Sequence, residues 1–262
     1  MNRAHLADAM LEYEEVGDGA PVLLLHGGLI NTVFPNLAEI SISRRYRVIS
    51  YRRRGYGGSS PASAPRTMKD QATDAEALLR HLGIRRAHLV GFSYGGGVAI
   101  QLALDAPQLI GSLALLEPSI PSAPVFVEDL AAITIMYAGG DREGAVGAFF
   151  AEVLGPNYRS LLEDQLGPTA FDHAVADSEA AFQVEAESLA NWECDVTRIR
   201  QPVLAVLGAD TLPAALESHT RLKQWLPQLE ELVIPDSNHS LPFAKPEAVA
   251  EGVGRFLDRH PL

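Results

Sequence analysis

A serine flanked by glycines carries the clearest chemistry in this sequence. Ser93 is the central residue of the segment 91–95, GFSYG, which fits the pattern G-x-S-x-G, and the serine directly follows the apolar run 87–92. In that pattern the serine occupies a strained strand-to-helix turn that exposes its hydroxyl group. Glycines at the flanking positions allow the strand and the helix to approach closely. We therefore interpret Ser93 as a candidate nucleophile.

A serine nucleophile needs a base within hydrogen-bonding distance, and histidine is the side chain whose ordinary pKa lies near neutral pH. His239 lies in a loop between the apolar run 231–234 and a helix predicted to begin at Pro246. Loops at the carboxyl ends of parallel strands are where catalytic groups gather in open α/β sheets. The other histidines occupy less suitable positions, so we predict His239 as the base.

Backbone N–H groups near the serine predict a site for a negatively charged oxygen. The segment HGG directly follows the apolar run 22–25, and its two glycines allow the backbone to bend towards the serine. We predict that the N–H groups of Gly28 and Tyr94 form an oxyanion hole, with Leu29 as the alternative donor to Gly28. His26, the first residue of the segment, is interpreted as a structural residue of this loop.

The elements that would position these residues alternate between short apolar runs and longer amphipathic stretches. The apolar runs, which are typical of parallel strands covered on both faces, are 22–25, 47–51, 87–92, 112–116, 202–207 and 231–234. Helical patterns lie over 68–82, 94–106, 214–226 and 246–259. The segment 11–16 predicts a further, antiparallel strand at the sheet edge. This alternation predicts an α/β fold with a doubly wound, mostly parallel sheet.

One long segment breaks the alternation. Residues 119–200 contain no convincing strand run, and their apolar spacing predicts helices, the longest of them around 171–189. A segment of this length is too long for a connecting loop. We predict a helical cap over the C-terminal edge of the sheet, so that the chain divides into a first core part (1–118), the cap (119–200) and a second core part (201–262).

Taken together, these segments resemble the α/β-hydrolase family over nearly the whole chain. The resemblance rests on HGG at 26–28, RGYGGS at 54–59, the Ser93 segment and His239, in that order and spacing. It implies an α/β-hydrolase fold with the same roles for the serine, the histidine and the two N–H donors. The arginines at 52–54 are expected to bind neighbouring carboxylates rather than the substrate.

The acid of the triad is where the sequence departs from the commoner family pattern. Many members place an aspartate three residues after the glycine that ends the penultimate strand; that position is Thr211 here, and Asp210 lies one residue earlier. Other branches, including haloalkane dehalogenases and zearalenone-type lactonases, take the acid from the end of the strand after the nucleophile helix, which is Glu117 here. We predict Glu117, with Asp210 and then Asp236 as alternatives.

The composition argues against several other classes of function. The chain of 262 residues carries a formal net charge of -12, which disfavours a nucleic-acid partner. With one cysteine, Cys194, and no long apolar stretch, we expect a cytoplasmic protein without a membrane partner. Spacings typical of phosphate-binding loops, dinucleotide sites or metal sites are missing from the sequence, so we expect no cofactor. The oligomeric state is not indicated.

These observations predict an enzyme: a cofactor-free serine hydrolase that cleaves a carboxylic ester or lactone of a mostly apolar small molecule through an acyl-enzyme. The same triad would also serve a C–C bond hydrolase or a perhydrolase, and the products would separate these activities. A third possibility is a receptor-like protein that binds a ligand with little turnover. The intact nucleophile, base and oxyanion glycines argue against it, although the fold alone proves no function.

Overall fold

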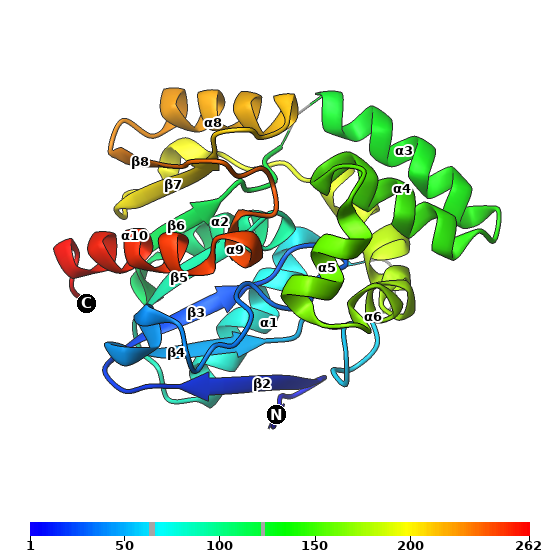
Figure 1. The fold of residues 1–262 in the computed structure, drawn as a ribbon. Coiled ribbons are helices and arrows are strands. Elements are labelled where there is room, and N and C mark those ends of the chain that lie inside the picture. Colours follow the sequence, from blue (N-terminus) through cyan, green and yellow to red (C-terminus); the bar gives the residue numbers. More distant parts are fainter. Residues whose placement is uncertain (63–65, 122–123) are drawn as a thin grey trace.

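A mixed β-sheet forms the centre of the molecule (Figure 1). The computed structural model describes residues 1–62, 66–121 and 124–262, and the side chains of these residues except those of 124–129. Within these residues, eight strands join in the order β1-β2-β4-β3-β5-β6-β7-β8. Their bounds are β1 Asn2–His5, β2 Met10–Val16, β3 Ala20–Leu25, β4 Tyr46–Tyr51, β5 Ala87–Phe92, β6 Ile110–Leu116, β7 Val203–Gly208 and β8 Leu229–Ile234. The first two pairings are antiparallel, and β3 to β8 run parallel to one another.

The predicted α/β fold with a mostly parallel sheet is confirmed, because the six apolar runs form the strands β3 to β8. Within β3, Leu24 packs into the hydrophobic cluster on one face of the sheet and Leu23 into the cluster on the other. Strands buried on both faces need apolar residues at successive positions, which explains the runs.

The antiparallel strand predicted at the sheet edge is β2, but it is not the edge strand. β1 pairs with its outer side, so that Ala4 lies opposite Leu11. Ala4 is the single buried residue of β1. A strand with one buried residue has no apolar run, and the sequence pattern therefore did not predict it.

Helices cover both faces of the sheet. On one face lie α1 (Met68–His81), α2 (Tyr94–Asp105) and α8 (Pro213–Trp225), and on the other lies α10 (Pro246–Arg259). The shorter helical turns are η1 (Ser41–Arg44), η2 (Pro107–Leu109) and α9 (Leu241–Ala244). The start of α1 is fixed by a capping box, in which Thr67 and Asp70 each accept a hydrogen bond from the other's backbone N–H.

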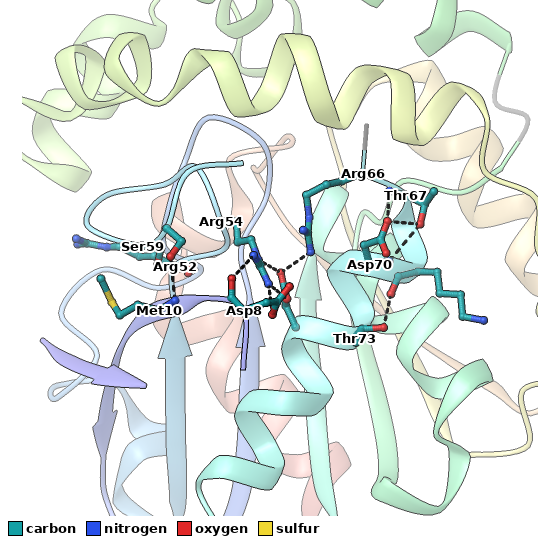
Figure 2. Close-up of polar contacts among 12 residues, drawn as sticks. Asp8, Met10, Arg52, Arg54, Ser59, Arg66, Thr67, Asp70 and Thr73 are labelled. Carbon is teal, nitrogen blue, oxygen red and sulfur yellow. Dashed lines mark hydrogen bonds and ion pairs between the residues drawn. The ribbon is translucent and has the colours of Figure 1, made fainter. Parts of the chain in front are cut away.

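Arg54 anchors the loop between β4 and α1, which Figure 2 shows in close-up. Its guanidinium donates to both carboxylate oxygens of Asp74 and to one of Asp8, each at 2.8 Å. Arg66 donates to the same Asp74 carboxylate at 3.0 Å. Its hydrogen bonds to the Asp74 carboxylate raise the pKa of Arg54. This arginine therefore binds carboxylates, as expected, and it ties the chain near β2 to the first turns of α1.

The helical segment between β6 and β7 lies beyond one end of the strands, where α3 to α6 gather in Figure 1. Its elements are α3 Pro124–Ala138, α4 Arg142–Leu154, α5 Tyr158–Leu166, α6 Ala170–Ala176, the π-helical turn η3 Ala180–Glu185, α7 Ala186–Ala190 and η4 Val196–Arg198. The predicted helical insertion is confirmed, but the prediction of a single long helix around 171–189 is wrong. The chain there divides into α6, η3 and α7. We continue to call residues 119–200 the cap, and this division of the chain into domains stays a prediction.

Candidate active site

Ser93 occupies a sharp turn between β5 and α2. Its backbone has φ 50° and ψ -121°, a conformation that costs a residue with a side chain on the order of 1–3 kcal/mol. The turn is held by a hydrogen bond from the Ser93 N–H to the carbonyl of Leu116 at 3.0 Å. The flanking glycines are required by space: a Cβ on Gly95 would lie 2.2 Å from the carbonyl oxygen of Leu25. The G-x-S-x-G pattern therefore reflects close packing of α2 against β3.

His239 and Glu117 form a buried pair beside Ser93. The Nδ1 atom of His239 lies 2.7 Å from Oε2 of Glu117, and the Glu117 side chain is fully buried. The imidazole ring also packs on Phe92, with 4.9 Å between the ring centroids. Ser93, Glu117 and His239 all line one cavity. The structure thus brings together a hydroxyl, an imidazole and a carboxylate from three separate loops.

Glu117 is held by two further donors, neither of which was predicted from the sequence. Its Oε1 accepts a hydrogen bond from the N–H of Gly208 at 2.8 Å, and its Oε2 accepts one from Oγ1 of Thr211 at 2.7 Å. Thr211 stands at the position where many family members have their aspartate. A hydroxyl-bearing side chain at this position was the signal in the sequence that could have indicated a contact with the acid. Asp210 and Asp236 are exposed. It is Glu117 that contacts His239.

The predicted oxyanion donors lie beside the serine. Gly28, Ser93 and Tyr94 line one small cavity. Among the described residues, the N–H groups of Gly28 and Tyr94 have no hydrogen-bond acceptor within the protein. The alternative donor, Leu29, is engaged: its N–H donates to the hydroxyl oxygen of Tyr56 at 3.2 Å. Two free N–H groups beside a hydroxyl suit the binding of an oxyanion.

A buried ion pair lies under this oxyanion loop. Arg53, 1% exposed, pairs with Glu185 of the cap, and its Nη2 also donates to the carbonyl of Gly27 at 2.9 Å. Tyr56 donates to the other Glu185 oxygen at 2.9 Å. The Arg53 guanidinium lies 4.7 Å from the ring centroid of Tyr94. Glu185 was not predicted from the sequence, because its partner lies more than a hundred residues away.

His26 is a structural residue of this loop, as predicted. Its Nε2 accepts a hydrogen bond from the N–H of Arg53 at 3.0 Å, and its Nδ1 lies 2.8 Å from the carbonyl of Gly27. Complete burial, with the Arg53 cation nearby, lowers the pKa of His26 well below its ordinary value. A neutral imidazole therefore joins the loop after β3 to the loop after β4.

Two unequal cavities meet at Ser93. The larger has a volume of about 220 Å³ and is bordered by His239, Trp192 and Leu212. The smaller has about 30 Å³ and is bordered by Gly28, Tyr94 and cap residues. Within the described residues, no group of three or more His, Cys, Asp or Glu side chains is arranged to hold a metal ion. In the same part of the chain, no helix is both long enough and apolar enough to cross a membrane.

Comparisons with known proteins place the chain in a family. It belongs to the α/β-hydrolase fold family, whose model, described as alpha/beta hydrolase fold, matches residues 20–186. The resemblance inferred from the motifs is therefore confirmed. A relative over nearly the full length is the 2-(acetamidomethylene)succinate hydrolase of Mesorhizobium japonicum, 26% identical over 98% of this chain and 94% of that protein.

Solved structures share the same architecture. A thermophilic esterase from Thermogutta terrifontis matches with a TM-score of 0.81 at 24% identity and covers 99% of both chains. The enol-lactonase from Burkholderia xenovorans LB400 matches with a TM-score of 0.80 at 20% identity and covers 98% of this chain and 100% of that one. At these sequence identities, the similarity shows a shared fold and no more.

Proposed function

We propose that this protein is a serine hydrolase that cleaves a carboxylic ester or lactone of a mostly apolar small molecule. The observation that carries the proposal is the buried Glu117–His239 pair, which shares one cavity with the strained Ser93. A carboxylate on Nδ1 orients the imidazole and leaves Nε2 to act as a base towards the serine. No cofactor is needed for this chemistry.

The proposed reaction proceeds through an acyl-enzyme. His239 takes the Ser93 proton as the hydroxyl oxygen attacks the carbonyl carbon, and the N–H groups of Gly28 and Tyr94 stabilise the oxyanion. His239 then protonates the leaving alcohol. A water molecule, deprotonated by His239, attacks the acyl-enzyme and releases the acid. Glu117 stabilises the imidazolium cation at both stages.

The largely apolar cavity beside His239 supports a mostly apolar substrate. The relatives named above include an esterase and a lactonase, and these names agree with ester or lactone chemistry. A cytoplasmic location and a small molecule as the partner remain predictions from the sequence.

A fluorophosphonate probe followed by intact mass and peptide mapping tests the proposal. We expect one adduct, on Ser93, that disappears in Ser93→Ala and falls at least a hundredfold in rate in His239→Ala. Ser160→Ala and His81→Ala, which change exposed residues away from the site, serve as matched controls. Absence of an adduct on folded protein would contradict the proposal and favour a receptor-like role. A panel of esters, lactones and C–C substrates then identifies the products.

A further inference from the structure

Apolar side chains form most of the wall of the larger cavity at Ser93. Ile120, Leu189 and Trp192 are among them. Trp192 is fixed in this wall, because its Nε1 donates a hydrogen bond to Oε1 of Gln101 at 2.7 Å. This bond uses the single polar atom of the indole. The ring therefore gives the cavity an aromatic surface without a free hydrogen-bond donor.

Within the described residues, Glu193 is the one carboxylate on this wall that has no partner. Glu117 and His239, the other titratable residues of the wall, bind each other. By contrast, no described residue forms an ion pair or a hydrogen bond with the Glu193 side chain. Glu193 is exposed, so its charge lies where the cavity meets solvent. No lysine or arginine is found among the described residues that border the cavity. A ligand there therefore meets a negative charge that no permanent cation compensates.

Ser218 of α8 adds a buried hydroxyl group to the same wall. The residue is 5% exposed, and its hydroxyl has no hydrogen-bond partner in the part of the chain that the structure describes. Serine and threonine in helices can donate to the carbonyl four residues earlier, as Thr220 does to Leu216 at 2.9 Å, but Ser218 does not. A buried polar group without a partner costs free energy, so this hydroxyl indicates a polar ligand or water in the cavity.

A protonated amine matches these three features together. Its N–H groups donate to oxygen acceptors, which Glu193 and Ser218 supply. Its charge is attracted by the carboxylate and by the aromatic ring of Trp192. The formal net charge of -12 also attracts cations to the protein and repels anions. A substrate with a carboxylate in this cavity would instead face the Glu193 charge.

We infer that the larger cavity binds a protonated amine of the substrate, and that the natural substrate is an ester with an apolar body and an ammonium group. Glu193 pairs with the ammonium group, Ser218 accepts one of its hydrogen bonds, and Trp192 packs on the adjacent apolar part. This inference rests on the proposed function and narrows its substrate class. The ammonium group is unchanged by the reaction, so the steps at Ser93 and His239 are those given above.

Ligand binding to the unmodified protein tests the amine site without any ester cleavage. Calorimetry compares benzylamine, which is protonated at pH 7.5, with benzyl alcohol, which has a similar size and no charge. We expect benzylamine to bind about fivefold more tightly at low salt, and this preference to shrink in 1 M NaCl, where the charges are screened. Glu193→Gln should abolish the preference. Glu187→Gln, which changes an exposed carboxylate of the cap that does not border the cavity, should keep it.

Two pairs of esters then test the substrate class. Comparing 4-(aminomethyl)benzyl acetate with 4-ethylbenzyl acetate places the charge in the alcohol part, and comparing methyl 4-(aminomethyl)phenylacetate with methyl 4-ethylphenylacetate places it in the acyl part. In each pair a CH₂–NH₃⁺ group replaces a CH₂–CH₃ group. We expect kcat/KM of the ammonium ester to exceed that of its neutral partner about fivefold in at least one pair. Ser218→Ala should reduce this ratio about threefold, because it removes one acceptor.

Glu193→Lys provides the strongest contrast, because it reverses the charge. In the pair that responds, the ratio should fall below one in this variant. Equal binding of benzylamine and benzyl alcohol, ratios near one in both ester pairs, or a preference for the ammonium ester that survives Glu193→Lys would each overturn the amine site. These outcomes are distinct from failure of the proposed function, in which the fluorophosphonate does not label Ser93 and no ester of either pair is cleaved.

Discussion

At the scale of single residues, the contact between Glu117 and His239 yields a sharp prediction about the acid. Glu117→Gln keeps the shape of the side chain but removes the charge that would stabilise the imidazolium. We expect kcat to fall by a factor on the order of 10²–10⁴. Steady-state ester hydrolysis, with circular dichroism to establish folding, measures this effect.

Asp210→Asn is the matched control, because Asp210 is the exposed alternative acid. Its activity should stay within about twofold of the original, since its N–H rather than its carboxylate is bound in the structure, to the carbonyl of Ser237. The opposite result, a large loss of activity in Asp210→Asn and a small one in Glu117→Gln, would contradict the assignment of Glu117 as the acid.

The candidate site residues that belong to a local sequence pattern could be predicted from the sequence. Ser93 lies in a recognisable turn, and His239 follows a strand. The choice between Glu117 and Asp210 depended on contacts across 122 residues of chain and on the way β6 and β7 end side by side. No sequence pattern marked Thr211 as part of the candidate site, because its role depends only on its hydrogen bond to the Glu117 carboxylate.

At the scale of elements, the Arg53–Glu185 pair joins the cap to the loop after β4. Glu185→Gln should destabilise the protein by roughly 3–5 kcal/mol, because it leaves the Arg53 charge buried without its partner. It should also slow fluorophosphonate labelling of Ser93, since Arg53 holds the carbonyl of Gly27 in the oxyanion loop. Urea unfolding and labelling rates measure the two effects.

Glu187→Gln changes an exposed carboxylate two residues further along the cap and serves as the control. It should alter unfolding by no more than about 0.5 kcal/mol. Equal behaviour of the two variants would show that the buried pair holds neither the cap nor the oxyanion loop.

Elements with strong apolar periodicity were predictable, and those shaped by contacts elsewhere were not. The strands β3 to β8 and the helices α1, α2, α8 and α10 follow from burial on one or two faces. The interrupted helix around 171–189 does not, because its apolar residues continue at helical spacing past the end of α6. The π-helical turn that follows ends at Glu185, the residue that reaches Arg53.

At the scale of the whole molecule, neutral His26 makes stability depend on pH. Burial lowers its pKa in the folded protein, whereas in the unfolded chain it takes up a proton near pH 6.5. The unfolded state therefore binds more protons as the pH falls below this value, and stability is lost. We expect His26 to account for about 1 kcal/mol of this loss by pH 5.5.

Urea midpoints at pH 7.5 and pH 5.5 test this expectation. His26→Gln replaces the histidine with a side chain that still donates and accepts hydrogen bonds but does not titrate. The variant should lose less stability than the original protein between the two pH values. A pH dependence that is identical in both proteins would show that His26 does not titrate on unfolding in this range.

The cap leaves the core after β6 and returns at β7, and these two strands are paired in parallel. The entire intervening segment can therefore be exchanged during evolution without rethreading the sheet or moving Ser93, His239 and Glu117. New substrate ranges can arise by remodelling one continuous stretch of the gene. Arg53 limits which caps can be exchanged. A new cap without a carboxylate in the place of Glu185 would leave the buried Arg53 cation without a partner beneath the oxyanion loop. Inheritance of a new cap thus requires a matching change in the core.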